Sequence, residues 1–143
     1  MRVVYSETSA VLSWLLGDER TQRVAKMIDF APKVVTSALT LIEAKRGILR
    51  ATRERCITAA DSVRLMDLLA GTISAWDIME MDHDIQARAG ESFPAEPVRT
   101  LDAIHLATAL EFRRVFSELS ILTFDERIMA NLEPLGLQRA RLA

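Results

Sequence analysis

Short hydrophobic runs rich in β-branched residues alternate with helix-like segments along this chain of 143 residues, and this alternation constrains the fold more than any other feature. Strands are predicted over residues 2–6, 33–37, 76–81, 119–124 and 137–140. Helices are predicted over residues 8–16, 18–30, 38–55, 58–74, 82–91, 100–114 and 126–132. Strands separated by helices form βαβ units, which build mostly parallel sheets covered on both faces. We therefore expect an α/β fold, a three-layer α/β/α sandwich, with residues 1–143 forming a single domain.

Composition excludes several classes of protein. The formal net charge is −2, so the chain is not a globally basic nucleic-acid binder, although a local basic patch remains open. No apolar run approaches the roughly 20 residues that a membrane span needs, and the N-terminus lacks the pattern of a signal peptide. The single cysteine, Cys56, excludes an internal disulfide framework and fits a reducing compartment. We therefore expect a cytoplasmic protein with no membrane association.

Four acidic residues occupy positions where an α/β protein can bring them together. Glu7 follows the first predicted strand, Asp102 lies in the first turn of a helix, and Asp125 follows the strand over 119–124. Each of these three alone is also explained by the preference of acids for helix N-termini. Because ligands bind outside the carboxyl ends of parallel strands, we expect the acids to converge there. Crowded carboxylates repel one another unless a hard cation neutralises them, which favours Mg²⁺, or Mn²⁺ as a substitute, at a site that handles phosphate.

Glu43 and Asp102 are the more specific members of this set. Glu43 lies in the middle of a helix, where capping cannot explain it, although an ion pair with Arg46 is an alternative. Asp102 begins a helix that is apolar on nearly every side, with Thr100 as its expected cap, and a carboxylate buried there needs a partner. We expect Glu43, Asp102 and Asp125 to share one pocket with Glu7 at its rim.

Four motifs, in this order, resemble those of the PIN-domain nucleases, and most closely the VapC-type toxins of bacterial and archaeal toxin–antitoxin pairs. The family opens with a strand followed by Asp-Thr-Ser-Ala, where this chain has Glu-Thr-Ser-Ala at 7–10. Its second acid, a Glu within a helix that follows a Thr/Ser-rich strand end, corresponds to Glu43. The third motif, Arg-Thr-Leu-Asp-Ala-Ile-His-Leu-Ala, matches residues 99–107 almost letter for letter, and the fourth, Thr-Phe-Asp-Glu-Arg, occupies residues 123–127. The match covers essentially the whole chain.

The resemblance implies a central parallel sheet and a Mg²⁺- or Mn²⁺-dependent endoribonuclease that a cognate antitoxin protein neutralises. It also implies a homodimer and an antitoxin segment that covers the active groove. By position, the metal-binding and catalytic acids would be Glu7, Glu43, Asp102 and Asp125. Thr8 or Ser9 would form hydrogen bonds nearby, and Arg46, Arg50 and Arg99 are the expected contacts to the RNA substrate. The helical arginines are alternatively a solvated helix face. The apolar helices 18–30 and 58–74 offer a partner-binding surface made of these residues: Met27, Phe30, Met66 and Leu69. Ordinary core packing is the alternative for the two methionines.

Glu7 departs from the family pattern, because its carboxylate lies one methylene further from the backbone than that of Asp. Mg²⁺ tolerates misplaced ligands poorly, so the alternative is a catalytically degenerate PIN domain that acts as a protein- or RNA-binding module. A receiver-like phospho-acceptor domain also gathers acids at strand ends, but the first strand here ends in one acid rather than a pair. His105, three residues after Asp102, is assigned a structural, helix-packing role.

Overall fold

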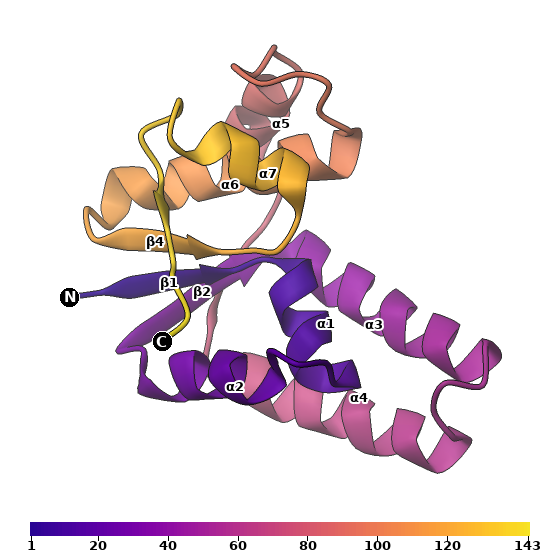
Figure 1. Ribbon diagram of the computed structural model, residues 1–143. Coiled ribbons are helices and arrows are strands. Elements are labelled where there is room, and N and C mark those ends of the chain that lie inside the picture. Colours follow the sequence, from indigo (N-terminus) through magenta and orange to yellow (C-terminus); the bar gives the residue numbers. More distant parts are fainter.

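The computed structural model describes all 143 residues and has a five-stranded parallel sheet at its centre, in the order β3-β2-β1-β4-β5 (Figure 1). The strands are β1 (Val3–Ser6), β2 (Lys33–Ser37), β3 (Asp77–Met79), β4 (Leu119–Leu122) and β5 (Gln138–Arg139). β1 pairs with β2 on one side and β4 on the other, with Tyr5 opposite both Val35 and Ile121. The carboxyl ends of the three central strands therefore lie together at one edge of the sheet.

Helices cover both faces of this sheet. The helices are α1 (Thr8–Leu16), α2 (Thr21–Phe30), α3 (Ala38–Arg53), α4 (Ala59–Ile73), α5 (His83–Ala89), α6 (Thr100–Val115) and α7 (Glu126–Leu132). In Figure 1, α1 to α4 lie below the sheet and α5 to α7 above it. The predicted three-layer α/β/α sandwich is confirmed.

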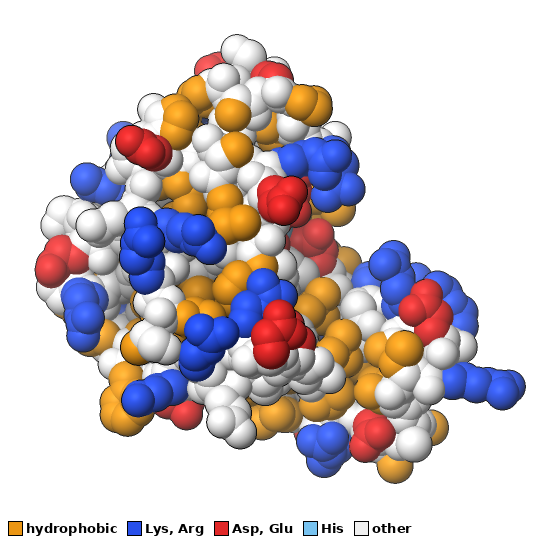
Figure 2. Space-filling model, in the orientation of Figure 1, with side chains coloured by type: hydrophobic (Ala, Val, Ile, Leu, Met, Phe, Trp, Pro, Cys, Tyr) orange, Lys and Arg blue, Asp and Glu red, His pale blue; other side chains and the backbone are white.

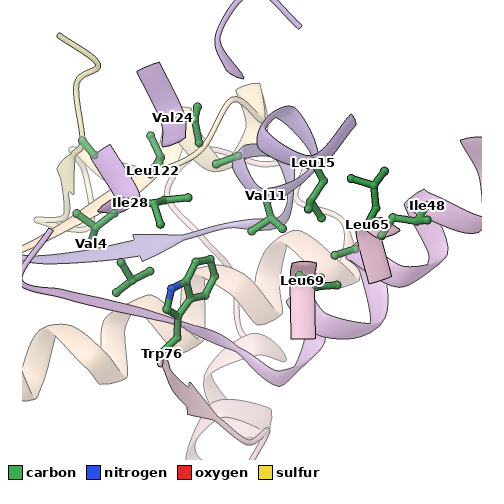
Figure 3. Close-up of a cluster of buried hydrophobic side chains, with 14 residues drawn as sticks. Val4, Val11, Leu15, Val24, Ile28, Ile48, Leu65, Leu69, Trp76 and Leu122 are labelled. Carbon is green, nitrogen blue, oxygen red and sulfur yellow. The ribbon is translucent and has the colours of Figure 1, made fainter. Parts of the chain in front are cut away.

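The alternation of side chains along each strand divides the core in two. Val4 and Val34 point into the cluster under α1 to α4, which Trp76 closes (Figure 3). Their neighbours Tyr5 and Val35 point into the cluster under α5 to α7. This period of two is the expected consequence of a pleated strand buried on both faces.

Tight helix packing holds α1 against α3 beside the carboxyl edge. A Cβ atom at Gly47 of α3 would lie 2.6 Å from Cδ2 of Leu12 in α1, so a larger residue there would require the Leu12 side chain to move. This close approach fixes α3, which carries Glu43, relative to α1, which begins directly after Glu7.

Two helices have N-cap residues other than the predicted ones. Glu7 rather than Thr8 or Ser9 is the N-cap of α1, and α6 starts at Thr100, so its N-cap is Arg99 without a side-chain cap. The strand predicted over 76–81 is only three residues long, because the pairing of β2 with β3 is confined to residues 35–37. No helix combines the length and apolarity needed to cross a membrane.

Candidate active site

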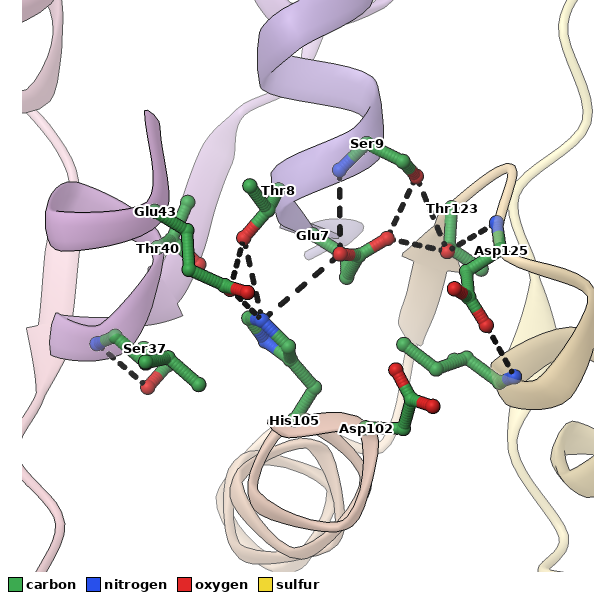
Figure 4. A network of polar contacts seen from close by, with 12 residues as sticks. Glu7, Thr8, Ser9, Ser37, Thr40, Glu43, Asp102, His105, Thr123 and Asp125 are labelled. Carbon is green, nitrogen blue, oxygen red and sulfur yellow. Dashed lines mark hydrogen bonds and ion pairs between the residues drawn. The ribbon is translucent and has the colours of Figure 1, made fainter. Parts of the chain in front are cut away.

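A cleft of about 510 Å³ at the carboxyl edge of the sheet contains all four of the acids singled out in the sequence. Glu7 follows β1, Glu43 lies on α3, Asp102 is in the first turn of α6, and Asp125 caps α7. The cleft is also lined by polar and basic residues from the same elements: Thr8, Ser9, Arg99, Thr100 and His105. The predicted convergence of the acids is therefore seen in the structure (Figure 4).

The Glu7 carboxylate is held by the protein's own hydroxyl groups. Its Oε1 accepts hydrogen bonds from Ser9 Oγ at 2.6 Å and Thr123 Oγ1 at 2.5 Å, and its Oε2 accepts one from the Ser9 backbone N–H at 3.2 Å. Glu7 is 5% exposed, so its predicted position at the rim of the pocket is wrong. The reason is its role as the N-cap of α1, which draws the carboxylate inward over the helix terminus.

Glu43 forms short hydrogen bonds to two buried side chains. Its Oε1 lies 2.6 Å from Thr8 Oγ1 and 2.6 Å from His105 Nε2. Burial opposes ionisation of Glu43, but the hydrogen bonds from His105 and Thr8, with the charge interaction with His105, outweigh it and hold the pKa of the Glu43 carboxyl below its usual value. The alternative ion pair with Arg46 is not formed.

Tyr5 and Glu43 lie at the two ring nitrogens of His105. The Tyr5 hydroxyl lies 2.8 Å from His105 Nδ1. Burial, followed by the charges of Glu7 and Glu43, raises the pKa of Tyr5 well above its usual value, so the phenol stays protonated. A protonated phenol can donate to Nδ1, and Nε2–H of His105 then donates to Glu43. His105 is thus more than a helix-packing residue, because it orients Glu43.

Asp102 and Asp125 have fewer partners. Asp102 is 5% exposed, yet its one ion-pair or hydrogen-bond partner is Arg99, whose Nε lies 3.4 Å from Oδ2. Oδ1 of Asp102 accepts no hydrogen bond from the protein and is not fully enclosed, so it faces the cleft with no partner from the chain. Arg99, with a largely exposed side chain, also reaches Asp125 through a nitrogen 3.8 Å from Oδ2, while Oδ1 of Asp125 caps α7. One long, exposed cationic side chain therefore serves two carboxylates.

The expected substrate-contacting residues divide between the cleft and the surface outside it. Thr8, Ser9 and Arg99 line the cleft. Arg46 and Arg50 are exposed on α3 beyond Glu43 and do not line it. Sequence reasoning missed Thr123, whose hydroxyl bonds to Glu7 and accepts from the Asp125 N–H. Its position directly before the Phe-Asp-Glu-Arg segment, at the end of β4, was the available signal.

The donor atoms fit a hard divalent cation. Glu7, Glu43 and His105 each offer one ligand atom within 4.8 Å of the others. In the arrangement in which Tyr5 donates to Nδ1 and Nε2–H donates to Glu43, the donors left facing the cleft are carboxylate oxygens. Asp102 has a buried carboxylate with one long ion pair, which leaves its charge poorly compensated. Oxygen-only donor sets with uncompensated negative charge suit Mg²⁺ or Mn²⁺.

Comparison with known proteins identifies the family. The PIN domain family model matches residues 4–133. Ribonuclease VapC35 of Mycobacterium tuberculosis is 31% identical over 137 residues, which cover 94% of this chain and 93% of that protein. Ribonuclease VapC46 of the same species is 28% identical over 138 residues, covering 96% and 95%.

Solved structures share the fold at lower sequence identity. VapC20 of M. tuberculosis, described as a sarcin-ricin loop cleaving toxin, has a TM-score of 0.67 at 19% identity, covering 96% of this chain and 98% of that one. FitAcB from Neisseria gonorrhoeae has a TM-score of 0.70 at 18% identity, covering 96% of both chains. The chain therefore belongs to the PIN-domain family, with curated relatives of the VapC type.

Proposed function

We propose that residues 1–143 form one PIN domain that acts as a metal-dependent endoribonuclease toxin in the cytoplasm, neutralised by a cognate antitoxin. The observation that carries the proposal is the cleft in which four carboxylates meet and in which buried Asp102 has only one long ion pair. Such a site is stabilised by a cation and is open to a ligand. The names of the curated relatives, which are ribonucleases, support RNA as the substrate.

Asp102, Asp125 and Glu43, with Glu7, are the residues that would hold Mg²⁺ or Mn²⁺. When bound, the ion would lower the pKa of a water molecule and offset charge on the scissile phosphate. Glu43 Oε2 makes no hydrogen bond within the protein, in contrast to Oε1, so it is free to accept a hydrogen bond from the attacking water. Thr8 and His105 keep that carboxylate ionised and fixed in direction.

Arg99 has the geometry to exchange partners when RNA enters. It is largely exposed, and both of its contacts to carboxylates are long, at 3.4 and 3.8 Å. A phosphate offers the guanidinium a bidentate partner. We propose that Arg99 leaves the acids for the substrate phosphate, while Arg46 and Arg50 on the exposed side of α3 contact the strand further from the cut.

A protein partner completes the proposal. One structure that shares this fold is a toxin–antitoxin complex from Klebsiella pneumoniae, and another is VapBC-1 from nontypeable Haemophilus influenzae. We propose that an antitoxin segment covers the acidic cleft and that the toxin is a homodimer. Of the residues predicted to form a partner surface, Phe30 is exposed, whereas Leu69 is 1% exposed within the core and cannot take part.

A catalytically degenerate binding module is the second candidate. The observation in its favour is that Glu7 Oε1 accepts two hydroxyl hydrogen bonds and Oε2 accepts one from a backbone N–H, so capping of α1 occupies this carboxylate. In that case the domain would bind RNA or antitoxin without cutting.

Cleavage of RNA with and without EDTA separates the two candidates. We expect purified protein to cut single-stranded RNA in Mg²⁺ or Mn²⁺, to stop when EDTA is added, and to resume when the metal is restored. Expression of the protein should arrest growth, and expression of Asp102→Asn should not. RNA binding without cleavage in either metal would favour the degenerate module.

A further inference from the structure

A second groove lies away from the acidic cleft, between α2 and the segment that runs from β5 to the C-terminus. Its volume is about 710 Å³, and its floor includes Val4 of β1 and Ser120 of β4. One wall is formed by α2 and the two residues that follow it, from Arg23 to Pro32. The other wall consists of residues 138–141 and Ala143. We call it the α2 groove. It reaches Arg2 and Pro32, which precede β1 and β2, so it opens toward the amino ends of the strands, opposite the cleft.

The α2 groove is strongly cationic in a chain whose net charge is negative. Its fourteen lining residues include five cationic side chains and no acid, and the cations are Arg2, Arg23, Lys26, Arg139 and Arg141. All five are exposed. In Figure 2, Lys and Arg side chains gather around a hydrophobic hollow in the region where α2 and the C-terminus lie in Figure 1.

None of these five cations forms an ion pair within the protein. The ion pairs of the chain involve Arg20, Lys33, Arg64, Arg99, Arg114, His105 and the N-terminus. None involves a cation of the α2 groove. Glu118 pairs with the N-terminal amine and also interacts with the charge of Arg2, but neither Glu118 nor Asp29 of α2 lines the groove. Unpaired charges of one sign along a groove concentrate a polyanion.

Apolar side chains accompany the charges. Phe30, at the end of α2, is 74% exposed, and Met27 lies beside it in the wall of the groove. An exposed aromatic ring among cations is the arrangement with which proteins bind single-stranded nucleic acid, by stacking a base while the cations contact phosphates. An acidic peptide would satisfy the charges but would leave the planar Phe30 ring without a matching π-face.

We propose that the α2 groove binds the backbone of single-stranded RNA at a point remote from the cut, with Phe30 stacking on one base. That this RNA is also the substrate of the acidic cleft rests on the proposed function. Because the groove and the cleft lie toward opposite ends of the strands, an RNA must extend by several nucleotides to contact both. Binding therefore strengthens with RNA length and shows little sequence preference, since one ring and a row of cations read no base edges.

The test measures binding separately from cleavage. Fluorescence anisotropy with a fluorescein-labelled single-stranded RNA of about 16 nucleotides, the upper end of a typical single-strand site, is followed in the cleavage-blocked Asp102→Asn background. Arg23→Gln with Lys26→Gln should weaken binding about tenfold and reduce the slope of log K against log salt by about 1.4, for two lost phosphate contacts. Phe30→Ala should weaken binding about fivefold.

Matched variants elsewhere on the surface control for charge and hydrophobicity. Arg113→Gln with Arg114→Gln removes two exposed cations from the end of α6, away from α3 and the α2 groove, and Val115→Ala trims a side chain that is 71% exposed. Both should bind RNA within about twofold of the background. All of the altered residues are exposed, and thermal melts confirm that each variant is folded.

Three results would overturn the proposal. The groove variants could bind RNA as tightly as their controls, duplex DNA could bind the groove as tightly as the single strand, or poly-glutamate of equal charge could bind it more tightly than RNA. The last result would assign the groove to an acidic peptide. If the groove variants bind RNA more weakly but the wild-type protein cuts no RNA, the α2 groove is supported and the nuclease proposal is refuted. If the wild-type protein cuts RNA but the groove variants bind it as tightly as their controls, the nuclease proposal is supported and the α2 groove is refuted.

Discussion

The two halves of the acidic cleft are built differently. On the side of α1 and α3, Glu7 and Glu43 accept five hydrogen bonds at 3.2 Å or less, from Ser9, Thr123, Thr8 and His105. On the side of α6, Asp102 has a single partner at 3.4 Å, the Arg99 guanidinium, which it shares with Asp125. Asp125 is also held by the Ile128 N–H that it caps, so Asp102 is the buried carboxylate that the protein leaves least satisfied.

This difference separates structural from ligand-dependent acids. A carboxylate that accepts several charge-assisted hydrogen bonds stabilises the fold whether or not a ligand is present. One that is buried beside a single exposed arginine costs free energy until a cation arrives. Variants on the first half should therefore change stability as well as cleavage, whereas variants on the second should change metal binding and cleavage without loss of stability.

Asp102→Asn should have the largest effect. The amide preserves the shape of the side chain but removes the charge that holds a divalent cation, so RNA cleavage should fall by about a thousandfold or more, as when a central electrostatic group is removed. The melting temperature without metal should not fall, because the buried charge is poorly compensated. Thermal melts and single-turnover cleavage assays measure the two effects.

Asp84→Asn is the matched control for Asp102→Asn, because Asp84 lies in the first turn of α5 but is exposed. Mg²⁺ or Mn²⁺ should raise the melting temperature of the wild type and of Asp84→Asn, and should leave that of Asp102→Asn unchanged. Retention of cleavage by Asp102→Asn would refute the four-carboxylate mechanism.

His105→Ala, which removes the α6 side chain bonded to Glu43 of α3, should be the most destabilising change in the first half of the cleft. It leaves the Tyr5 hydroxyl and Glu43 Oε1 without their shared partner and opens a cavity at a residue that is 2% exposed. The free energy of unfolding should fall by about 3 kcal/mol, of the order of one unsatisfied buried group and a small cavity. Urea unfolding measures the change.

Exposed His83, the first residue of α5, supplies the control for His105, and His83→Ala should change the unfolding free energy by less than about 0.5 kcal/mol. Equal losses in the two variants would show that the Tyr5–His105–Glu43 contacts contribute nothing. The comparison thus tests whether this half of the cleft is part of the folded core.

Sequence patterns predicted the fold and the meeting of the acids because both follow from local rules. Alternating strands and helices imply a parallel sheet, and residues after its strands share an edge, which placed Glu7 and Asp125 correctly near each other. The partners of the acids depend instead on how α6 is rotated against β1. That rotation, which brings His105 to Tyr5 and Glu43 across 100 and 62 residues, leaves no local signature.

The pH dependence of stability should show the charge of Glu43. Its pKa is lowered in the folded protein, so its stabilising contribution is present above the ordinary glutamate pKa of about 4.3 and is lost as the pH falls through the folded value. Between neutral pH and about pH 3, the wild type should lose about 1 kcal/mol more than Glu43→Gln, the order of one charged hydrogen bond. Asp18 and Asp61 also have lowered pKa values, but they titrate in both proteins and cancel. Equal losses of unfolding free energy in the wild type and in Glu43→Gln would mean that the protein does not hold Glu43 as a carboxylate.

Glu7→Asp should have the smallest effect, and it probes the boundary between the two halves. Aspartate is a preferred N-cap, so the shorter residue can still accept from the Ser9 N–H and preserve α1. Its carboxylate would withdraw from Thr123, however, and lie nearer the position that the family pattern assigns to a ligand. We expect metal-dependent RNA cleavage to rise by a few-fold, with a smaller gain in Mn²⁺ than in Mg²⁺, because Mg²⁺ demands more exact octahedral geometry. Thr123→Val is the companion variant, since it removes the same hydrogen bond while Glu7 keeps its length, although it also removes the acceptor of the Asp125 N–H. Faster cleavage by Glu7→Asp alone would show that position limits the wild type. If neither variant cleaves faster in either metal, Glu7 is already a competent ligand or serves only as the cap of α1.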